Sequence, residues 1–157
     1  MSQLSRQMER DLCGMAGVFF VATELSRMRY VVSPTWRNYP SVDLFVLNPL
    51  CERRANIQVK THCIRQGKQR RGWYPLGRIG NNDFFVFVEI NDTGAPEYSV
   101  IPNSEVRSMA QRRLEEWNKS PNHNEKNHFL ELEDVDNYRS SGWEKLRSFL
   151  DCGVTNG

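Results

Sequence analysis

Three polar residues lie on two apolar segments that the sequence predicts to be neighbouring strands. Asp43 opens a segment that ends at residue 47, and Gln58 and Lys60 lie within residues 57–61. Moving an isolated carboxylate, amide or ammonium group from water into a protein interior costs several kcal/mol. These three side chains are therefore expected to be paired, to bind a metal ion or to be functional.

Hydrolysis of a phosphodiester is the chemistry that suits these residue types. The reaction needs a cation that polarises the phosphoryl oxygen and lowers the pKa of the attacking water. Asp43 offers an anionic oxygen, Gln58 a neutral one and Val59 a backbone carbonyl, and this set fits Mg²⁺ or Mn²⁺, because hard cations prefer oxygen ligands. Lys60 would hold the water or stabilise the charge that develops on the phosphate.

Strand geometry can bring these groups together. Side chains two residues apart share one face of a strand and are separated by about 7 Å, so Gln58 and Lys60 address one small site beside Asp43 if the strands pair. The segment 43–47 has apolar residues on both faces. We therefore expect it to be a central strand that is covered from two sides.

Hydrophobic periodicity predicts the remaining elements. Residues 9–28 form an amphipathic helix, in which Gly14 and Gly17 indicate close packing against a sheet or backbone, because each costs about 1 kcal/mol of helix stability. The glycine-rich segment 62–82 is predicted to be a loop with at most a short turn of helix. Further strands are expected at 30–33, 84–90, 97–101 and 129–132, and further helices after caps at Asn103 or Ser104 and at Ser141.

Charge is distributed unevenly along the chain. Residues 1–80 hold 13 Lys and Arg against 5 Asp and Glu, a net of +8, whereas residues 81–157 hold 8 against 14, a net of −6. A basic half around the candidate site indicates a polyanionic partner, because Lys and Arg neutralise phosphates. Alternatively, the two halves face each other or water. The candidate nucleic-acid contacts are Arg37, Arg65, Lys68, Arg70, Arg71 and Trp73, of which Trp73 could stack on a base or simply cover the core.

Composition predicts a single folded domain over residues 1–157, with a core at about 9–117 and a C-terminal helical extension at about 129–152. Hydrophobic residues make up 39% and aromatic residues 11% of the chain, which excludes a disordered protein. Neither a membrane span nor a signal peptide is apparent, so a soluble, cytoplasmic protein is expected. The four cysteines lack metal-site spacing and are predicted to be free thiols: Cys13, Cys51, Cys63 and Cys152.

Five short motifs occur in a recognisable order. They are Gly14-Met15-Ala16-Gly17, Phe20-Val21-Ala22, Glu24-Leu25-Ser26-Arg27, Val42-Asp43-Leu44 and Ile57-Gln58-Val59-Lys60-Thr61. With the order of predicted elements over about residues 12–105, they resemble the PD-(D/E)xK nuclease superfamily, and within it small uncharacterised members related to Holliday-junction resolvases.

The resemblance implies a restriction-endonuclease-like α/β (α+β) core, with a central mixed sheet of about five strands flanked by helices. It also implies a Mg²⁺-dependent endonuclease in which Asp43, Gln58 and Lys60 are catalytic, and in which Asp43, Gln58 and the Val59 carbonyl hold the metal. The implied partner is nucleic acid, with DNA as the expected substrate. Resolvase-like relatives are often dimers, so a homodimer is expected if the surface carries an exposed apolar patch.

Three positions depart from the superfamily pattern. Val42 replaces the proline before the first acid, Gln58 replaces the second acid, and Val18 lies where relatives often carry a glutamate. Glu24 follows Val18 by six residues, about 240° around the helix, so it is at most an accessory residue. The alternative for Glu24 is a surface ion pair with Arg27 or Arg29.

Two alternatives to an active nuclease therefore remain open. The first is a catalytically inactive nuclease-like module that binds nucleic acid or a protein partner through its basic half, and Val18 and Gln58 favour it. The second is an inert buried ion pair between Asp43 and Lys60, because structural ion pairs can mimic functional sites.

Overall fold

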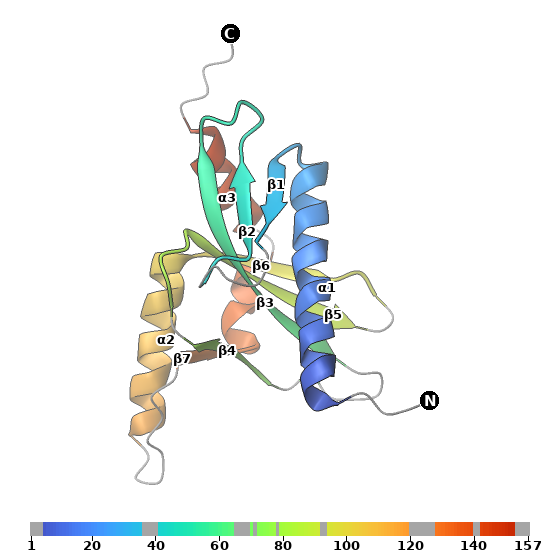
Figure 1. Cartoon of the computed structure of the whole chain (residues 1–157). Helices are drawn as coiled ribbons and strands as arrows, with labels where there is room; N and C mark the ends of the chain where they lie inside the picture. Colours follow the sequence, from blue (N-terminus) through green and yellow to red (C-terminus); the bar gives the residue numbers. More distant parts are fainter. Residues whose placement is uncertain are drawn as a thin grey trace.

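A computed structural model describes residues 5–35, 41–64, 70, 72–77, 79–91, 94–119, 128–139 and 142–152 (Figure 1). Its elements are α1 (Arg6–Arg27), β1 (Val31–Pro34), β2 (Leu44–Leu47), β3 (Arg54–Ile64), β4 (Trp73–Gly77), β5 (Phe84–Asn91), β6 (Glu97–Pro102), α2 (Asn103–Asn118), β7 (His128–Glu131), the 3-10 helix η1 (Glu133–Tyr138) and α3 (Gly142–Asp151). Among the described helices, none combines the length and apolarity needed to cross a membrane.

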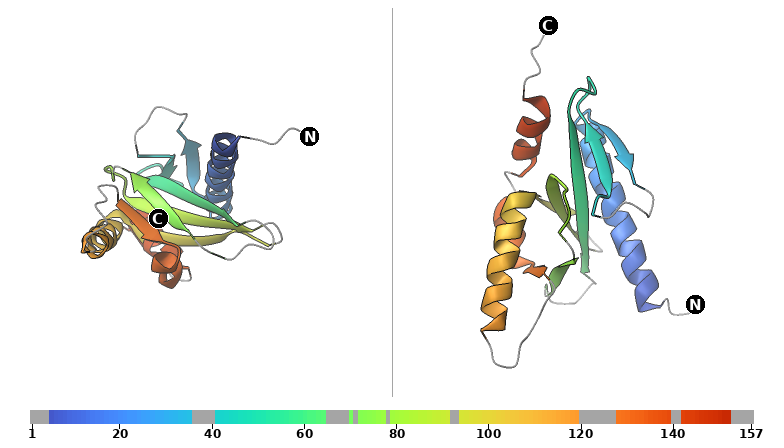
Figure 2. Two further views of the ribbon diagram at one scale, coloured as in Figure 1. Left: turned by 90° about the horizontal axis from the view of Figure 1, so that it is seen from below. Right: turned by 60° about the vertical axis from the view of Figure 1, so that its left-hand side comes forward.

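The central sheet has five strands in the order β1-β2-β3-β5-β6. β3 and β5 run parallel, and the other neighbours in this sheet run antiparallel. Helices α1 and α2 lie on opposite faces of the sheet, as Figure 2 shows. The mixed five-stranded sheet flanked by helices that the sequence predicts is confirmed.

Strand β5 explains how the two faces are packed. Phe84, Val86 and Val88 point to the face covered by α1 and α3, whereas Phe85 and Phe87 point to the face covered by α2 and the small β4–β7 sheet. All five side chains are buried. A strand that is buried on both faces needs a continuous apolar run, which is what the sequence shows at this segment.

Strand β2 is covered on one face rather than two, so the predicted double coverage is wrong. Leu44 and Val46 are fully buried beneath α1, whereas Phe45 and Leu47 are only half-buried. Among the described residues, the core under α2 contains no side chain of β1, β2 or β3. The second face therefore stays open on the β2 side, where Asp43 lies.

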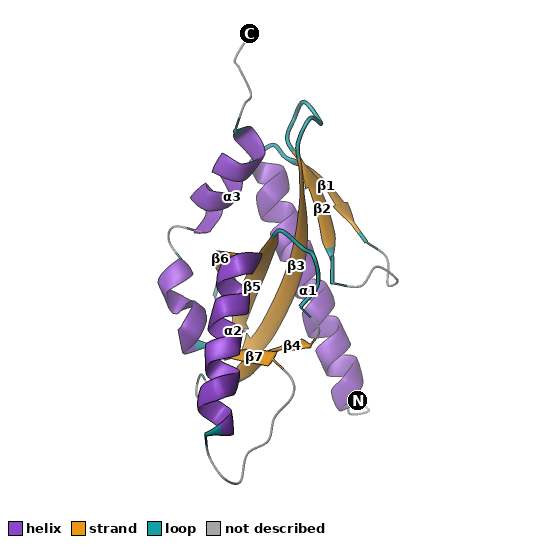
Figure 3. Cartoon of the chain, turned by 90° about the vertical axis from the view of Figure 1, so that its left-hand side faces the viewer, coloured by secondary structure: helices purple, strands orange, loops and turns teal. Residues whose placement is uncertain are grey.

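The segment predicted as a loop contains a strand. Residues 62–64 extend β3, and β4 pairs antiparallel with β7, which confirms the strand predicted near residue 129. Figure 3 shows β4 and β7 beneath α2. Tyr74 and Leu76 are buried while their neighbours are exposed, so β4 has a true two-residue period. Pro75 and Gly77 conceal this period in the sequence, because both are usually read as strand breakers.

The predicted cap of α2 is also wrong. The residue before the helix is Pro102, and no side chain caps the helix. Asn103 instead donates its side-chain amide to the carbonyl oxygens of Gly80 and Asn82, at 3.0 and 2.6 Å. Its amide thus holds the β4–β5 connection rather than the helix terminus. Ser141, the predicted cap of the last helix, lies outside the described residues.

Gly17 is the contact point between α1 and β3. A Cβ atom at Gly17 would lie 1.9 Å from Thr61 Oγ1 and 2.9 Å from Thr61 Cβ, whereas a Cβ atom at Gly14 would meet nothing within 4 Å. The predicted close packing is confirmed at Gly17 and wrong at Gly14.

Alanine substitutions at the two glycines are expected to act in opposite directions. Gly17→Ala should lower the free energy of unfolding by about 1–3 kcal/mol, because the branched Thr61 side chain is stiff and the helix must move away. Gly14→Ala, the matched control, should raise it by up to about 1 kcal/mol through helix propensity. Urea unfolding of both variants measures the difference; equal values would show that α1 is not held this closely.

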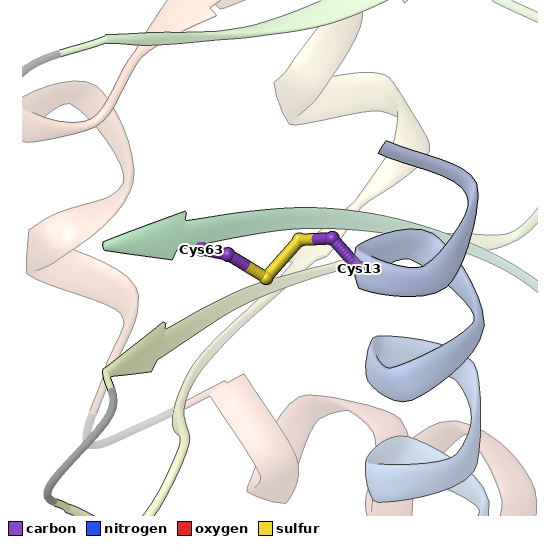
Figure 4. The surroundings of a disulfide bond; sticks show 2 residues. All are labelled: Cys13 and Cys63. Carbon is purple, nitrogen blue, oxygen red and sulfur yellow. A yellow bond between two sulfur atoms is a disulfide. The ribbon is translucent and has the colours of Figure 1, made fainter. Parts of the chain in front are cut away.

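A disulfide between Cys13 and Cys63 joins α1 to the end of β3 (Figure 4). The prediction of free thiols is therefore wrong for these two cysteines, whereas Cys51 and Cys152 are free and exposed. The two bonded residues are 50 positions apart in the sequence. Only the packing of α1 against β3 brings them together, and local cysteine spacing does not reveal it.

Candidate active site

The candidate site lies where β2 begins. β2 pairs with β3 from Leu44 opposite Ile57 onward, and the Asp43 N–H donates to the Ile57 carbonyl at 2.8 Å. Extending this register by one residue places Asp43 opposite Gln58, and directly opposed residues share a face of the sheet. Lys60 follows on the same face of β3. The sheet thus brings together the three residues that the sequence singled out.

The Asp43 carboxylate is anchored to the backbone of β3. Its Oδ2 accepts a hydrogen bond from the Val59 N–H at 2.7 Å. Burial raises the pKa of Asp43, and the Val59 hydrogen bond and the nearby charge of Lys60 oppose this rise without cancelling it. The ionised carboxylate is therefore incompletely compensated by its protein surroundings, which favours a cation beside it.

Burial also disfavours the charged form of Lys60. Burial lowers the pKa of Lys60, and attraction to Asp43 only partly opposes the shift. Across the described part of the chain, no ion pair within 4.0 Å links the Lys60 ammonium to Asp43 or to any other carboxylate. The inert buried ion pair considered from the sequence is therefore not formed, and the ammonium keeps its hydrogen-bonding capacity for a ligand.

Gln58 offers an unpaired oxygen at the site, one of seven buried side-chain nitrogen or oxygen atoms without a hydrogen-bond partner among the described residues. The residue is 9% exposed, and its Oε1 atom finds no hydrogen-bond partner in the part of the chain that the structure describes. A buried acceptor without a partner costs about 1–3 kcal/mol. An amide oxygen beside a carboxylate on the neighbouring strand is a suitable pair of ligands for Mg²⁺.

The residues present fit a partly hydrated cation rather than a fully protein-bound one. Within the described residues, no cluster of three or more His, Cys, Asp or Glu side chains could hold a metal ion. Mg²⁺ usually keeps several waters and binds through one or two carboxylates plus substrate phosphate. The Asp43 carboxylate, the Gln58 amide oxygen and the Val59 carbonyl match that requirement in number and type.

Val18 and Glu24 on α1 do not extend the site. Val18 is partly buried against the core between α1 and the sheet. Glu24 pairs with Arg27 at 3.0 Å, the surface ion pair considered from the sequence. Since α1 contacts β3 through Thr61, on the face opposite Gln58 and Lys60, the accessory role of Glu24 gains no support from its position.

Arg70 is held by acidic groups of the second half of the chain. Its guanidinium binds Glu89 at 2.8 Å and Asp136 at 2.6 Å, and it also donates to the Leu132 carbonyl at 3.3 Å. Glu89 is buried on β5, so the network joins β5 to η1 and the segment before it. Part of the basic excess is thus neutralised within the chain, and a phosphate at Arg70 would have to compete with these bonds.

Of the other predicted nucleic-acid contacts, the structure describes Trp73. Trp73 is 63% exposed on β4, so it does not cover the core and its indole ring is accessible to a base. The remaining basic candidates lie outside the described residues: Arg37, Arg65, Lys68 and Arg71.

Comparison with known proteins supports the architecture. Neither a protein-family model nor a curated protein matches the chain. The chain is similar to a solved structure, that of the bacterial homing endonuclease I-Ssp6803I, with a TM-score of 0.54 and 14% sequence identity over 88% of this chain and 92% of that one. At this identity the likeness shows the fold alone. The chain therefore has a nuclease-like fold.

Proposed function

We propose that this chain is a metal-dependent endonuclease that hydrolyses phosphodiester bonds in nucleic acid, with DNA as the expected substrate. The observation that carries the proposal is the placement of Gln58 Oε1, a buried acceptor without a partner among the described residues, opposite the Asp43 carboxylate that the Val59 N–H holds in position. The nuclease-like fold supports it, because the similar solved structure is that of a homing endonuclease.

Each residue has a distinct role in the proposed reaction. Asp43, Gln58 and the Val59 carbonyl would hold Mg²⁺ or Mn²⁺, which supplies positive charge to polarise the phosphoryl oxygen and activate water. Lys60 would orient the attacking water or stabilise the charge that develops on the phosphate. Its partial burial strengthens this interaction, because charges attract more strongly where water is excluded.

A cleavage assay tests the proposal. Purified protein is incubated with end-labelled linear DNA, branched DNA and RNA in Mg²⁺, Mn²⁺ or EDTA. We expect cleavage of at least one substrate in Mg²⁺ or Mn²⁺ and none in EDTA. Failure to cut any of them with either metal would contradict the proposal. Salt-sensitive binding without cleavage, unaffected by EDTA, would instead identify the inactive nucleic-acid-binding module.

The homodimer remains a prediction, and α1 carries the exposed apolar patch that it requires. Met8, Leu12, Met15 and Phe19 are 42–53% exposed at four- and three-residue spacing, on the side of α1 away from the sheet. α1 has three arginines and three acids, so its charges cancel and do not oppose self-association. Light scattering of the purified protein measures the oligomeric state directly.

A further inference from the structure

A surface groove of about 590 Å³ lies between α1 and the end of β3, on the face of the sheet opposite Gln58 and Lys60. It is lined by the first two turns of α1 and by residues 61–63 of β3, next to the Cys13–Cys63 disulfide. β2 pairs with β3 only over residues 54–57, so beyond Gln58 this edge of β3 has no partner strand among the described residues. The site and the groove therefore share one open strand edge.

Two arginines enter this groove because α1 extends beyond its contact with β3. Val21 and Gly17 face the sheet. Arg10 lies seven residues before Gly17 and Arg6 four residues earlier still, so both occupy the same helical face. An amphipathic helix would ordinarily carry apolar residues at these positions. Here the face projects past the contact and lines the groove with guanidinium groups.

Both guanidinium groups are available for a ligand. Arg6 and Arg10 are exposed, and neither forms an ion pair or side-chain hydrogen bond with the residues that the structure describes. The groove also contains one acid, Glu9, which is half-buried. Arg70 provides the contrast, since its guanidinium is bound to Glu89 and Asp136.

The spacing suits a nucleic-acid strand. A β-strand rises about 3.3 Å per residue, so the groove at residues 61–63 extends to about 10 Å from Lys60. Successive nucleotides of one strand advance about 3.4 Å along a duplex axis, so this distance corresponds to about three nucleotides. A strand with its reacting phosphate at Lys60 that passes over the open edge of β3 to the α1 face would thus bring a neighbouring phosphate to Arg6 and Arg10.

We infer that Arg6 and Arg10 bind the sugar-phosphate backbone of the nucleic acid on one side of the reacting phosphate, where it crosses the open edge of β3 to the α1 face. The inference rests on the proposed function, because it takes the polyanion at Lys60 to be the substrate. Arginine suits this task, since its guanidinium remains charged and donates several hydrogen bonds to phosphate oxygens.

DNA binding measured in EDTA, where metal-dependent cleavage cannot occur, isolates the contribution of Arg6 and Arg10 to affinity. The Arg6→Ala/Arg10→Ala variant, Arg147→Ala and the wild-type chain are titrated in EDTA against a fluorescein-labelled 20-base-pair DNA duplex at several salt concentrations. Arg147 is the matched control, because it is an exposed arginine on α3, outside the groove. We expect the double variant to weaken binding about tenfold and to reduce the salt slope by about 1.8, and Arg147→Ala to change neither.

The possible results distinguish a failure of the binding inference from a failure of the proposed nuclease activity. Arg6→Lys/Arg10→Lys should retain the wild-type salt slope, because it keeps both charges. Wild-type affinity and slope in the double alanine variant, or no DNA binding by the wild-type chain, would overturn the inference. If the wild-type chain binds DNA with the expected dependence on Arg6 and Arg10 but cuts no substrate in Mg²⁺ or Mn²⁺, the proposed nuclease activity fails while the binding groove is supported.

Discussion

Replacing Asp43 with asparagine is expected to reduce Mg²⁺-dependent cleavage by about 10³-fold or more. The substitution removes the only anionic ligand proposed for the metal, while the asparagine oxygen can still accept the Val59 N–H bond that Asp43 accepts at 2.7 Å. Lys60→Met, which keeps most of the side-chain length but removes the charge, should have a similar effect. Single-turnover cleavage rates measure both losses.

The Asp43→Asn variant is expected to stay folded, with a Tm equal to or above that of the wild-type chain at pH 7. Burial raises the folded-state pKa of Asp43 above its unfolded value. Folding therefore disfavours the ionised form of Asp43, and ionisation lowers the free energy of unfolding. This destabilisation is absent below the unfolded pKa of about 3.9 and fully present above the raised folded pKa. Asparagine removes this cost, so lost cleavage with retained stability indicates a functional role.

Asp83→Asn provides the matched control. The Asp83 Oδ2 accepts the Asn56 N–H of the same strand β3 at 2.7 Å, so this carboxylate has an equivalent backbone hydrogen bond outside the site. The control should keep cleavage near the wild-type rate. Wild-type cleavage by Asp43→Asn, or an equal loss in Asp83→Asn, would remove the catalytic assignment of Asp43.

The Cys13–Cys63 disulfide is expected to contribute about 4 kcal/mol to the free energy of unfolding, because it closes a long loop and restricts the unfolded chain. The bonded cysteines are 50 positions apart. Cys13→Ser/Cys63→Ser should therefore lower stability in urea unfolding under oxidising conditions. Cys51→Ser/Cys152→Ser, which removes only free and exposed thiols, should leave it near the wild-type value.

Dithiothreitol gives an independent check of the same bond. It should destabilise the wild-type chain by a similar amount and leave the Cys13→Ser/Cys63→Ser variant unchanged. Equal unfolding midpoints for the wild-type chain with and without reductant would show that the disulfide does not form in solution, and that the prediction of free thiols was right.

The sequence predicted what depends on local periodicity. Alternation along residues 43–47 and 57–61 put Asp43, Gln58 and Lys60 on one face, and the register of β2 and β3 confirms this arrangement. The same reasoning could not show which face of β2 is covered. Coverage depends on where α2 and the β4–β7 sheet pack, and those elements come from the second half of the chain.

Long-range contacts explain most of what the sequence did not predict. The Cys13–Cys63 bond requires α1 to lie along β3, and Arg70 was predicted to contact nucleic acid because its acidic partners are distant in sequence. Arg6 and Arg10 had a readable signal, because they continue the sheet-facing positions of the first helix. The sequence alone does not show that these two positions lie beyond the contact of the helix with Thr61, which the structure places at Gly17.

A Mn²⁺ soak of a crystal of the wild-type chain, followed by an anomalous difference map, tests whether Asp43 and Gln58 bind a metal ion together. We expect a peak within about 2–2.5 Å of an Asp43 carboxylate oxygen and of Gln58 Oε1, the range of hard cation–oxygen bonds. A crystal of the Asp43→Asn variant under the same conditions should lack or weaken that peak. A wild-type map with no peak between these two side chains at saturating Mn²⁺ would show that they do not form a metal site.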